Sequence, residues 1–203
     1  ERRATARGWK DLDVSLDVGT RLLRGRYELA VGPRLSADDA VSWEAFTDFG
    51  LRYLVKTWAY AGDEPDRVQR ALWDAELRTL YKVASSPGAS EALVVMRDAG
   101  LDRNAHCFAM VLEAPGYAPL SATLERRAQY PWLSNVNATA RRELWSALER
   151  VAAGLDLLHD RQVLHRDVSV EALFISNEEG SESLRLGGFE WSVRLGRPLG
   201  ADP

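Results

Sequence analysis

Apolar residues recur in short runs over the first half of the chain, a pattern typical of β-strands separated by turns. Gly32-Pro33 and Asp48-Phe49-Gly50 are breaker or turn sequences between the first three runs. Together the runs predict five strands, at Tyr27 to Val31, Val41 to Phe46, Leu51 to Trp58, Ala92 to Met96 and Cys107 to Leu112. We expect the first three strands to form an antiparallel meander, and segments 85–90 and 98–104 to be loops.

Helical spacing first occurs at Pro65 to Val83, where apolar residues follow three- and four-residue steps. Glu76 falls on the same apolar face. A carboxylate in an apolar stripe is costly unless it is paired, and Lys56 on the third strand is the expected cation partner. The alternative is that Glu76 reaches solvent at the edge of the stripe.

The second half of the chain is mainly helical by pattern. A short helix is predicted at Leu120 to Arg127 and a long one at Ala138 to His159, followed by a hairpin of Leu173 to Ile175 and Leu184 to Leu186. The long helix is expected to pack through Leu144, Leu148, Val151, Leu155 and Leu158. The fold class is therefore α+β. If this Leu face lacks partners within the chain, we expect a neighbouring chain to cover it.

The composition indicates which partners and which cellular compartment we expect for this chain. The 203 residues are 46% hydrophobic and carry a net charge of −4, with both signs interspersed, so no nucleic-acid or membrane contact is expected. The single cysteine, Cys107, lies in an apolar run, which excludes a disulfide framework and favours a reducing compartment such as the cytoplasm. The chain begins at Glu1 instead of a Met and stops at Pro203. We therefore expect it to be a part of a longer protein.

One stretch, from Leu164 to Phe174, connects the long helix to the hairpin. Its triplet His165-Arg166-Asp167 resembles the His-Arg-Asp catalytic loop of protein kinases, and Glu171 also matches that loop. The resemblance implies that Asp167 stands at the position of the catalytic base, supported by Arg166 and His165. The metal-binding Asn of the family is replaced by Ala172.

Further motifs of the same family follow in order along the chain. The strand ending in Lys56 resembles the kinase strand whose Lys contacts the nucleotide phosphates, and Glu76 stands where its partner Glu would be. By the same resemblance, Leu54 and Phe174 would lie above and below the adenine, and Leu112 would gate the back of the pocket beside a hinge at 113–116.

Several positions differ from the kinase family, and each difference weakens the expected binding of nucleotide or metal. The turn at 32–40 has one Gly, one Pro and two carboxylates where kinases have a Gly-rich phosphate loop. Gly188-Phe189-Glu190 stands where kinases have Asp-Phe-Gly, so Gly188 and Ala172 replace both metal ligands. Glu190 and Glu171 are the remaining carboxylates, and we expect Glu190 to lie on the opposite side of its segment from the lost metal ligand. The large Leu54 and Phe174 would fill the adenine slot.

The resemblance implies a bilobal kinase-like fold with a leading segment at 1–26, a five-stranded amino-terminal lobe at 27–114 and an incomplete helical lobe at 115–203. It also implies a pseudokinase, which would act as a regulatory or scaffolding domain of a larger bacterial protein in signalling or phage defence. The alternatives are an atypical Ser/Thr protein kinase and a metal-independent nucleotide sensor. No cofactor is expected. If the site is active, ATP and Mg²⁺ would bind. Expected partners are other domains, other proteins or a second copy.

Overall fold

The structure is a computed structural model that describes residues 16–35, 40–60, 67–113, 118–176 and 183–195. The chain divides into two compact units. The first unit contains Glu1–Leu77, Met96–Glu113 and Pro203, and the second contains Arg78–Val95 and Ala114–Asp202. The proposed hinge at 114–116, the tip of the first turn at 36–39 and the expected helix start at Pro65 lie outside the described residues.

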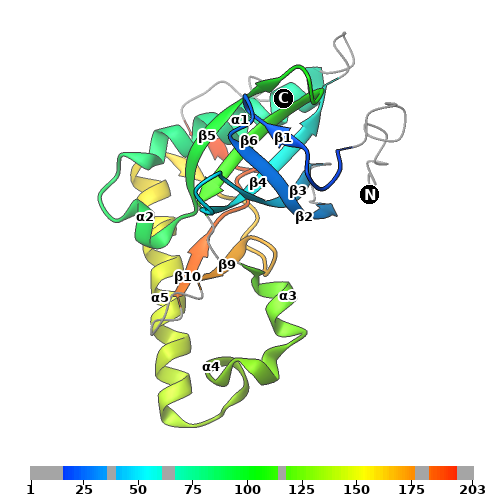
Figure 1. The fold of residues 1–203 in the computed structure, drawn as a ribbon. Helices are drawn as coiled ribbons and strands as arrows, with labels where there is room; N and C mark the ends of the chain where they lie inside the picture. Colours follow the sequence, from blue (N-terminus) through cyan, green and yellow to red (C-terminus); the bar gives the residue numbers. More distant parts are fainter. Residues whose placement is uncertain (1–15, 36–39, 61–66, 114–117, 177–182, 196–203) are drawn as a thin grey trace, which may run out of the picture. The chain divides into compact units, whose positions relative to one another are not determined.

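The first unit is built on a six-stranded sheet with the order β1-β2-β3-β4-β6-β5. Its strands are β1 (Arg21–Leu22), β2 (Tyr27–Leu35), β3 (Val41–Phe46), β4 (Arg52–Ala59), β5 (Val95–Asp102) and β6 (Cys107–Glu113). Strands β4 and β6 lie side by side in antiparallel register in the middle of the sheet (Figure 1). The predicted meander of the first three strands is confirmed as β2-β3-β4.

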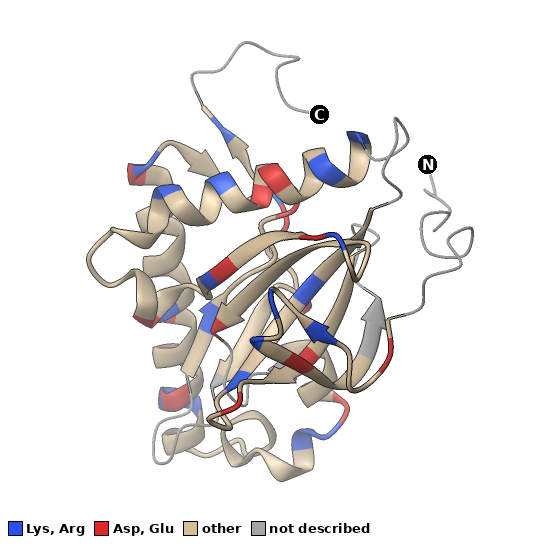
Figure 2. Ribbon diagram, turned by 45° about the horizontal axis from the view of Figure 1, so that its top comes forward, with Lys and Arg blue, Asp and Glu red and all other residues tan. Residues whose placement is uncertain are grey.

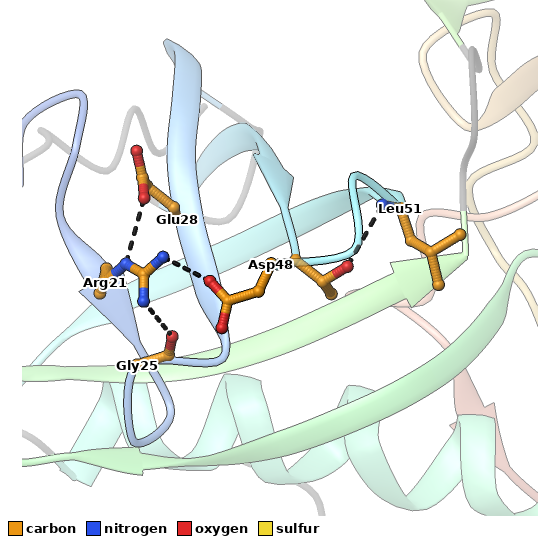
Figure 3. Close-up of polar contacts among 6 residues, drawn as sticks. Arg21, Gly25, Glu28, Asp48 and Leu51 are labelled. Carbon is orange, nitrogen blue, oxygen red and sulfur yellow. Dashed lines mark hydrogen bonds and ion pairs between the residues drawn. The ribbon is translucent and has the colours of Figure 1, made fainter.

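The prediction of five strands was wrong by one, because β1 is too short to produce a periodic pattern. Arg21 holds this two-residue strand on the sheet (Figure 3). Its guanidinium donates from Nε to Glu28 at 3.1 Å, from one terminal nitrogen to Asp48 at 2.5 Å, and from the other to the Gly25 carbonyl at 3.3 Å. One side chain therefore ties β1 to its own hairpin turn and to the turn after β3.

The predicted breaker at Gly32-Pro33 does not end β2, which continues to Leu35. The pairing of β2 with β3 shifts register after Leu29 and again after Val31, so bulges absorb the irregular residues. Gly32 has φ +152°, and a Cβ built there would lie 2.8 Å from the Trp43 ring. This close approach requires glycine.

The predicted strand at Ala92 to Met96 was right only at Val95 and Met96, the first two residues of β5, and wrong from Ala92 to Val94. Helix α2 (Ala89–Ala92) occupies part of the expected loop at 85–90, and β5 begins at Val95 and runs through most of the segment expected to be a loop. Leu93 and Val94 are 1% and 2% exposed. The apolar run therefore marked burial rather than a strand, whereas the edge strand β5 is half-exposed and carries charged residues that hide its pattern.

The core of the first unit lies against the sheet and includes Cys107, which is fully buried. Burial, followed by the negative charge of Asp102, raises the pKa of the Cys107 thiol to about 12. Because the thiolate is the reactive form, we expect native protein not to react with Ellman's reagent at pH 8, and to react fully in urea. Rapid modification of the native chain would contradict this burial.

The second unit contains helices α3 (Leu120–Leu124), α4 (Pro131–Ser134) and α5 (Ala138–Asp160), and Figure 1 shows α4 beside the amino-terminal half of α5. The predicted long helix and hairpin are confirmed, the hairpin as β9 (Leu173–Ser176) and β10 (Ser183–Leu186). The short strand β7 (Ala118–Pro119) pairs with β9, and β8 (Val163–Leu164) pairs with β11 (Val193–Arg194). The side chain of Asn137 caps α5 by accepting from Ala140 N at 2.8 Å.

The packing face of α5 differs from the predicted Leu face. Its buried residues are Ala140, Ala147, Val151, Gly154 and Leu158. Leu148 is 37% exposed, and a Cβ on Gly154 would lie 2.9 Å from Leu93 and 3.2 Å from the Ala92 carbonyl. The contact between α5 and α2 is so close that it uses small residues, which turns part of the Leu face away from the core.

Basic and acidic residues are interspersed along the ribbon (Figure 2). Among the described residues, no helix is both long and apolar enough to cross a membrane.

Candidate functional site

The candidate residues form two groups, one in each unit, and each group is described by itself. In the first unit, Lys56 on β4 meets Glu76 on α1 (Arg67–Ala84), with 2.7 Å between Nζ and Oε2. The two side chains are 5% and 1% exposed, so the predicted ion pair is present and the solvent-facing alternative for Glu76 was wrong. Lys56 Nζ also lies 5.0 Å from the centre of the Trp58 ring, a cation–π distance.

Leu54 and Leu112, the other nucleotide-site candidates of this unit, are directly opposite each other in the register of β4 and β6. Leu112 is buried and Leu54 is half-buried. Residues two apart on a strand share a face of the sheet, so Leu54 lies on the same face as Lys56. The register therefore brings these three candidates together on one side of the sheet.

In the second unit, the loop after α5 is organised by His165. The ring accepts from the Asp167 backbone N–H at 3.3 Å through Nδ1, and Nε2 donates to the Gly187 carbonyl at 2.8 Å. Because an amide can only donate and a carbonyl can only accept, the ring is the neutral tautomer with its proton on Nε2. The ring centre lies 5.3 Å from that of Phe189.

His165 is 2% exposed, and burial lowers its pKa below the ordinary 6.5, against the opposing effects of the Gly187 hydrogen bond and the charges of Glu190 and Asp167. The unfolded chain therefore binds the extra proton as the pH falls. We expect the free energy of unfolding to be fully retained above pH 6.5 and to decrease below it, by at most about 1.4 kcal/mol per pH unit from this group.

Urea unfolding between pH 8 and pH 5 measures this dependence. The replacement His165→Phe removes the titrating group but keeps Asp167 and Glu190, so its stability should fall less steeply with acid than that of the wild type. Equal slopes for the two proteins would show that His165 does not contribute.

The next residue in the loop, Arg166, has φ +70° although it is not a glycine. Its side chain is exposed, and Asp167 beside it is half-buried. A left-handed backbone at such a residue costs on the order of 1 kcal/mol and persists only when its surroundings hold it. Here the hydrogen bond from Asp167 N to His165 holds the turn, which fixes the backbone from which the Asp167 carboxylate projects.

Ala172 and Gly188, which we expected at the metal-ligand positions from the resemblance to kinases, lie against each other. A Cβ built on Gly188 would be 3.0 Å from the Ala172 Cβ, and the Ala172 carbonyl accepts from Gly187 N at 2.8 Å. Ala172 is 4% exposed. Neither side chain offers an oxygen atom, which Mg²⁺ requires, so these two positions do not fit a metal ion.

Glu190 lies beside Gly188 and not on the opposite side of the segment. Its Oε2 is 3.3 Å from the Cβ position of Gly188, so the expectation that it would face the opposite side was wrong. Residues two apart in an extended segment share a face, so alternation alone already places Glu190 on the side of Gly188. Glu190 thus brings a carboxylate next to Gly188.

The remaining candidates of this unit are Glu171 and Phe174. Glu171 is exposed, and Phe174 is half-buried on β9. A Cβ on Gly187 would lie 2.8 Å from the Phe174 ring, so the ring covers the backbone that leads to Gly188.

Two hydroxyl residues that the sequence did not single out hold the segment after Phe189. Ser192 Oγ donates to the Phe189 carbonyl at 2.7 Å, and it lies 3.0 Å from Thr79 Oγ1. Thr79 is 2% exposed in α1. The only indication of this contact in the sequence was the position of Thr79 within the predicted helix.

Within the described residues, no group of three or more His, Cys, Asp or Glu side chains is arranged to hold a metal ion. In comparison with known proteins, neither a family model nor a curated protein matches this chain.

Proposed function

We propose that this chain is a pseudokinase domain that serves as a regulatory or docking module of a larger bacterial cytosolic protein. The observation that carries the proposal is the contact between Ala172 and Gly188, which stand at the two metal-ligand positions of kinases and have no oxygen ligand. Phosphoryl transfer depends on metal ions that neutralise the phosphates, so these replacements remove a central part of the chemistry.

The structural frame associated with that chemistry supports the same proposal. The order β2-β3-β4-β6-β5 with one helix carrying a Glu agrees with the number and order of elements expected for a kinase amino-terminal lobe. The buried pair of Lys56 and Glu76 and the packing of His165 on Phe189 are the contacts that the resemblance implies. A domain that acts by binding partners needs a stable fold, but it does not need metal ligands.

A thermal-shift titration with ATP tests the proposal. Ligand that binds only the folded state raises its stability by RT ln(1 + [L]/Kd), which is about 2.7 kcal/mol at a hundredfold excess over Kd. We expect no shift with ATP and either Mg²⁺ or Mn²⁺. A shift that needs the metal would contradict the proposal, and a shift with ATP alone would favour the nucleotide sensor.

The matched control removes both members of the ion pair, so that neither charge stays buried after the other is lost. The double variant Lys56→Met with Glu76→Leu keeps an apolar core of similar volume. Any shift that this variant retains comes from a nucleotide bound elsewhere on the chain.

A second candidate function, an atypical Ser/Thr protein kinase, is favoured by the position of Glu190. Its carboxylate next to the Cβ position of Gly188 would supply one metal ligand from two residues downstream. Asp167 would then be the base and Lys56 would contact the phosphates. This candidate requires a metal-dependent shift that Glu190→Gln abolishes and Glu171→Gln leaves unchanged.

A further inference from the structure

Helix α5 presents a second stripe, separate from its buried face, and this stripe is apolar from Trp145 to Leu155. We call it the α5 stripe, and it follows a four-three spacing along the helix: Arg141, Trp145, Leu148, Ala152, Leu155 and His159. Trp145 is 70% exposed and Leu148 is 37% exposed. All members of the stripe except the half-buried Leu155 are exposed. This spacing is that of a coiled-coil seam.

The chain's own core does not use the centre of this stripe. The face that contacts α2 and β10 is formed by small and aliphatic residues such as Ala147 and Val151. Trp is among the residue types most enriched at the centre of interfaces, and Leu148, one turn from Trp145, adds apolar area beside it. The α5 stripe therefore has the composition of a contact surface.

The charges beside the stripe indicate which partner fits it. Arg142 and Glu149 lie on the same flank, seven residues apart, and both are exposed. Among the described residues neither forms an ion pair within the chain. Seven residues are two helical turns, so the two opposite charges lie on either side of the Trp145 and Leu148 pair.

This arrangement is complementary to itself. If a second α5 lies antiparallel on the first, Trp145 of each helix faces Leu148 of the other. The same register brings Arg142 of each helix to Glu149 of the other, since charges on the flank of an antiparallel seam meet across it. A twofold axis therefore forms the contact between Arg142 and Glu149 twice. This is the property of an isologous interface, in which both copies use the same surface.

We propose that the α5 stripe is a self-association surface on which a second copy of this chain binds antiparallel. The proposal does not depend on the pseudokinase function. Because one helix face is a small interface, the dimer is weak, with a dissociation constant on the order of 100 μM. Such a contact responds to local concentration, as when two copies are brought together by attached domains.

Sedimentation equilibrium of the 203-residue chain, from about 10 μM to about 1 mM, tests the proposal. We expect the mass to rise from monomer to dimer. Arg142→Glu alone and Glu149→Arg alone each place two like-charge contacts in the dimer and should weaken association at least about tenfold. The two changes together restore opposite charges and should return association to within about threefold of the wild type.

This charge swap separates a specific register from a general charge effect. The two single variants move the net charge in opposite directions, so non-specific repulsion would strengthen one and weaken the other. Trp145→Ser should abolish association, whereas Phe49→Ser, which removes an equally prominent aromatic residue that is 92% exposed in the first unit, should not change it. A chain that stays monomeric at 1 mM, or a swap that fails to restore association, overturns the proposal.

Discussion

Replacing Glu76 by Ala is expected to lower the free energy of unfolding by about 3–5 kcal/mol, and Lys56→Ala by a similar amount. Each change removes the partner that lies 2.7 Å from the opposite charge, in a region where the two side chains are 5% and 1% exposed. A buried charge that loses this ion pair does not regain full solvation, so the cost comes mainly from the residue that stays. Urea unfolding followed by circular dichroism measures the loss.

The double variant Lys56→Met with Glu76→Leu separates this effect from a simple loss of packing. Removing both charges and filling the space with apolar groups should restore most of the stability, to within about 1–2 kcal/mol of the wild type. If the double variant is as unstable as the sum of the two single variants, the pair does not act as a unit. The ion pair would then be a minor contact.

Placing a carboxylate at the position of Gly188 is expected to destabilise the chain. Gly188→Asp should cost about 2–4 kcal/mol, because a side chain at φ +71° is strained and its Cβ would lie 3.0 Å from Ala172. The carboxylate of Glu190 is already 3.3 Å from that Cβ position and would repel a second negative charge. Thermal and urea unfolding give the size of the effect.

Two companions of Gly188→Asp identify its cause. Gly188→Ala carries the backbone strain and the steric contact without the charge, so it should be less destabilising than Gly188→Asp. Adding Glu190→Gln to Gly188→Asp should recover part of the difference. If Glu190→Gln brings no recovery, the Glu190 carboxylate does not compete for the space beside Gly188.

The elements that could be predicted from the sequence are those with long, regular patterns. The 23 residues of α5 and the strand Val41–Phe46 were predicted almost to the residue, since each repeats its period several times. The pairing of Lys56 with Glu76 could also be predicted, because a carboxylate in an apolar stripe requires a cation. The periodicity of each element is visible in neighbouring residues, and the ion pair follows from the free-energy cost of burying a carboxylate without a cation.

Two features could not be predicted from the sequence, for physical reasons. The edge strand β5 carries Arg97, Asp98 and Asp102 among its eight residues, so its pattern resembles that of a loop. The buried face of α5 is set by how closely α2 approaches Gly154, which depends on tertiary structure. The side on which Glu190 lies could have been predicted, because residues two apart in an extended segment share a face.

A turnover assay tests directly whether the proposed pseudokinase transfers phosphate. Purified chain would be incubated with γ-labelled ATP, Mg²⁺ or Mn²⁺ and a generic protein substrate, beside Asp167→Asn, which replaces the candidate base without changing its size. If the chain is a pseudokinase, we expect no phosphoprotein above the level of the Asp167→Asn control. Label transfer that depends on metal and disappears in Asp167→Asn would contradict it and establish an active kinase.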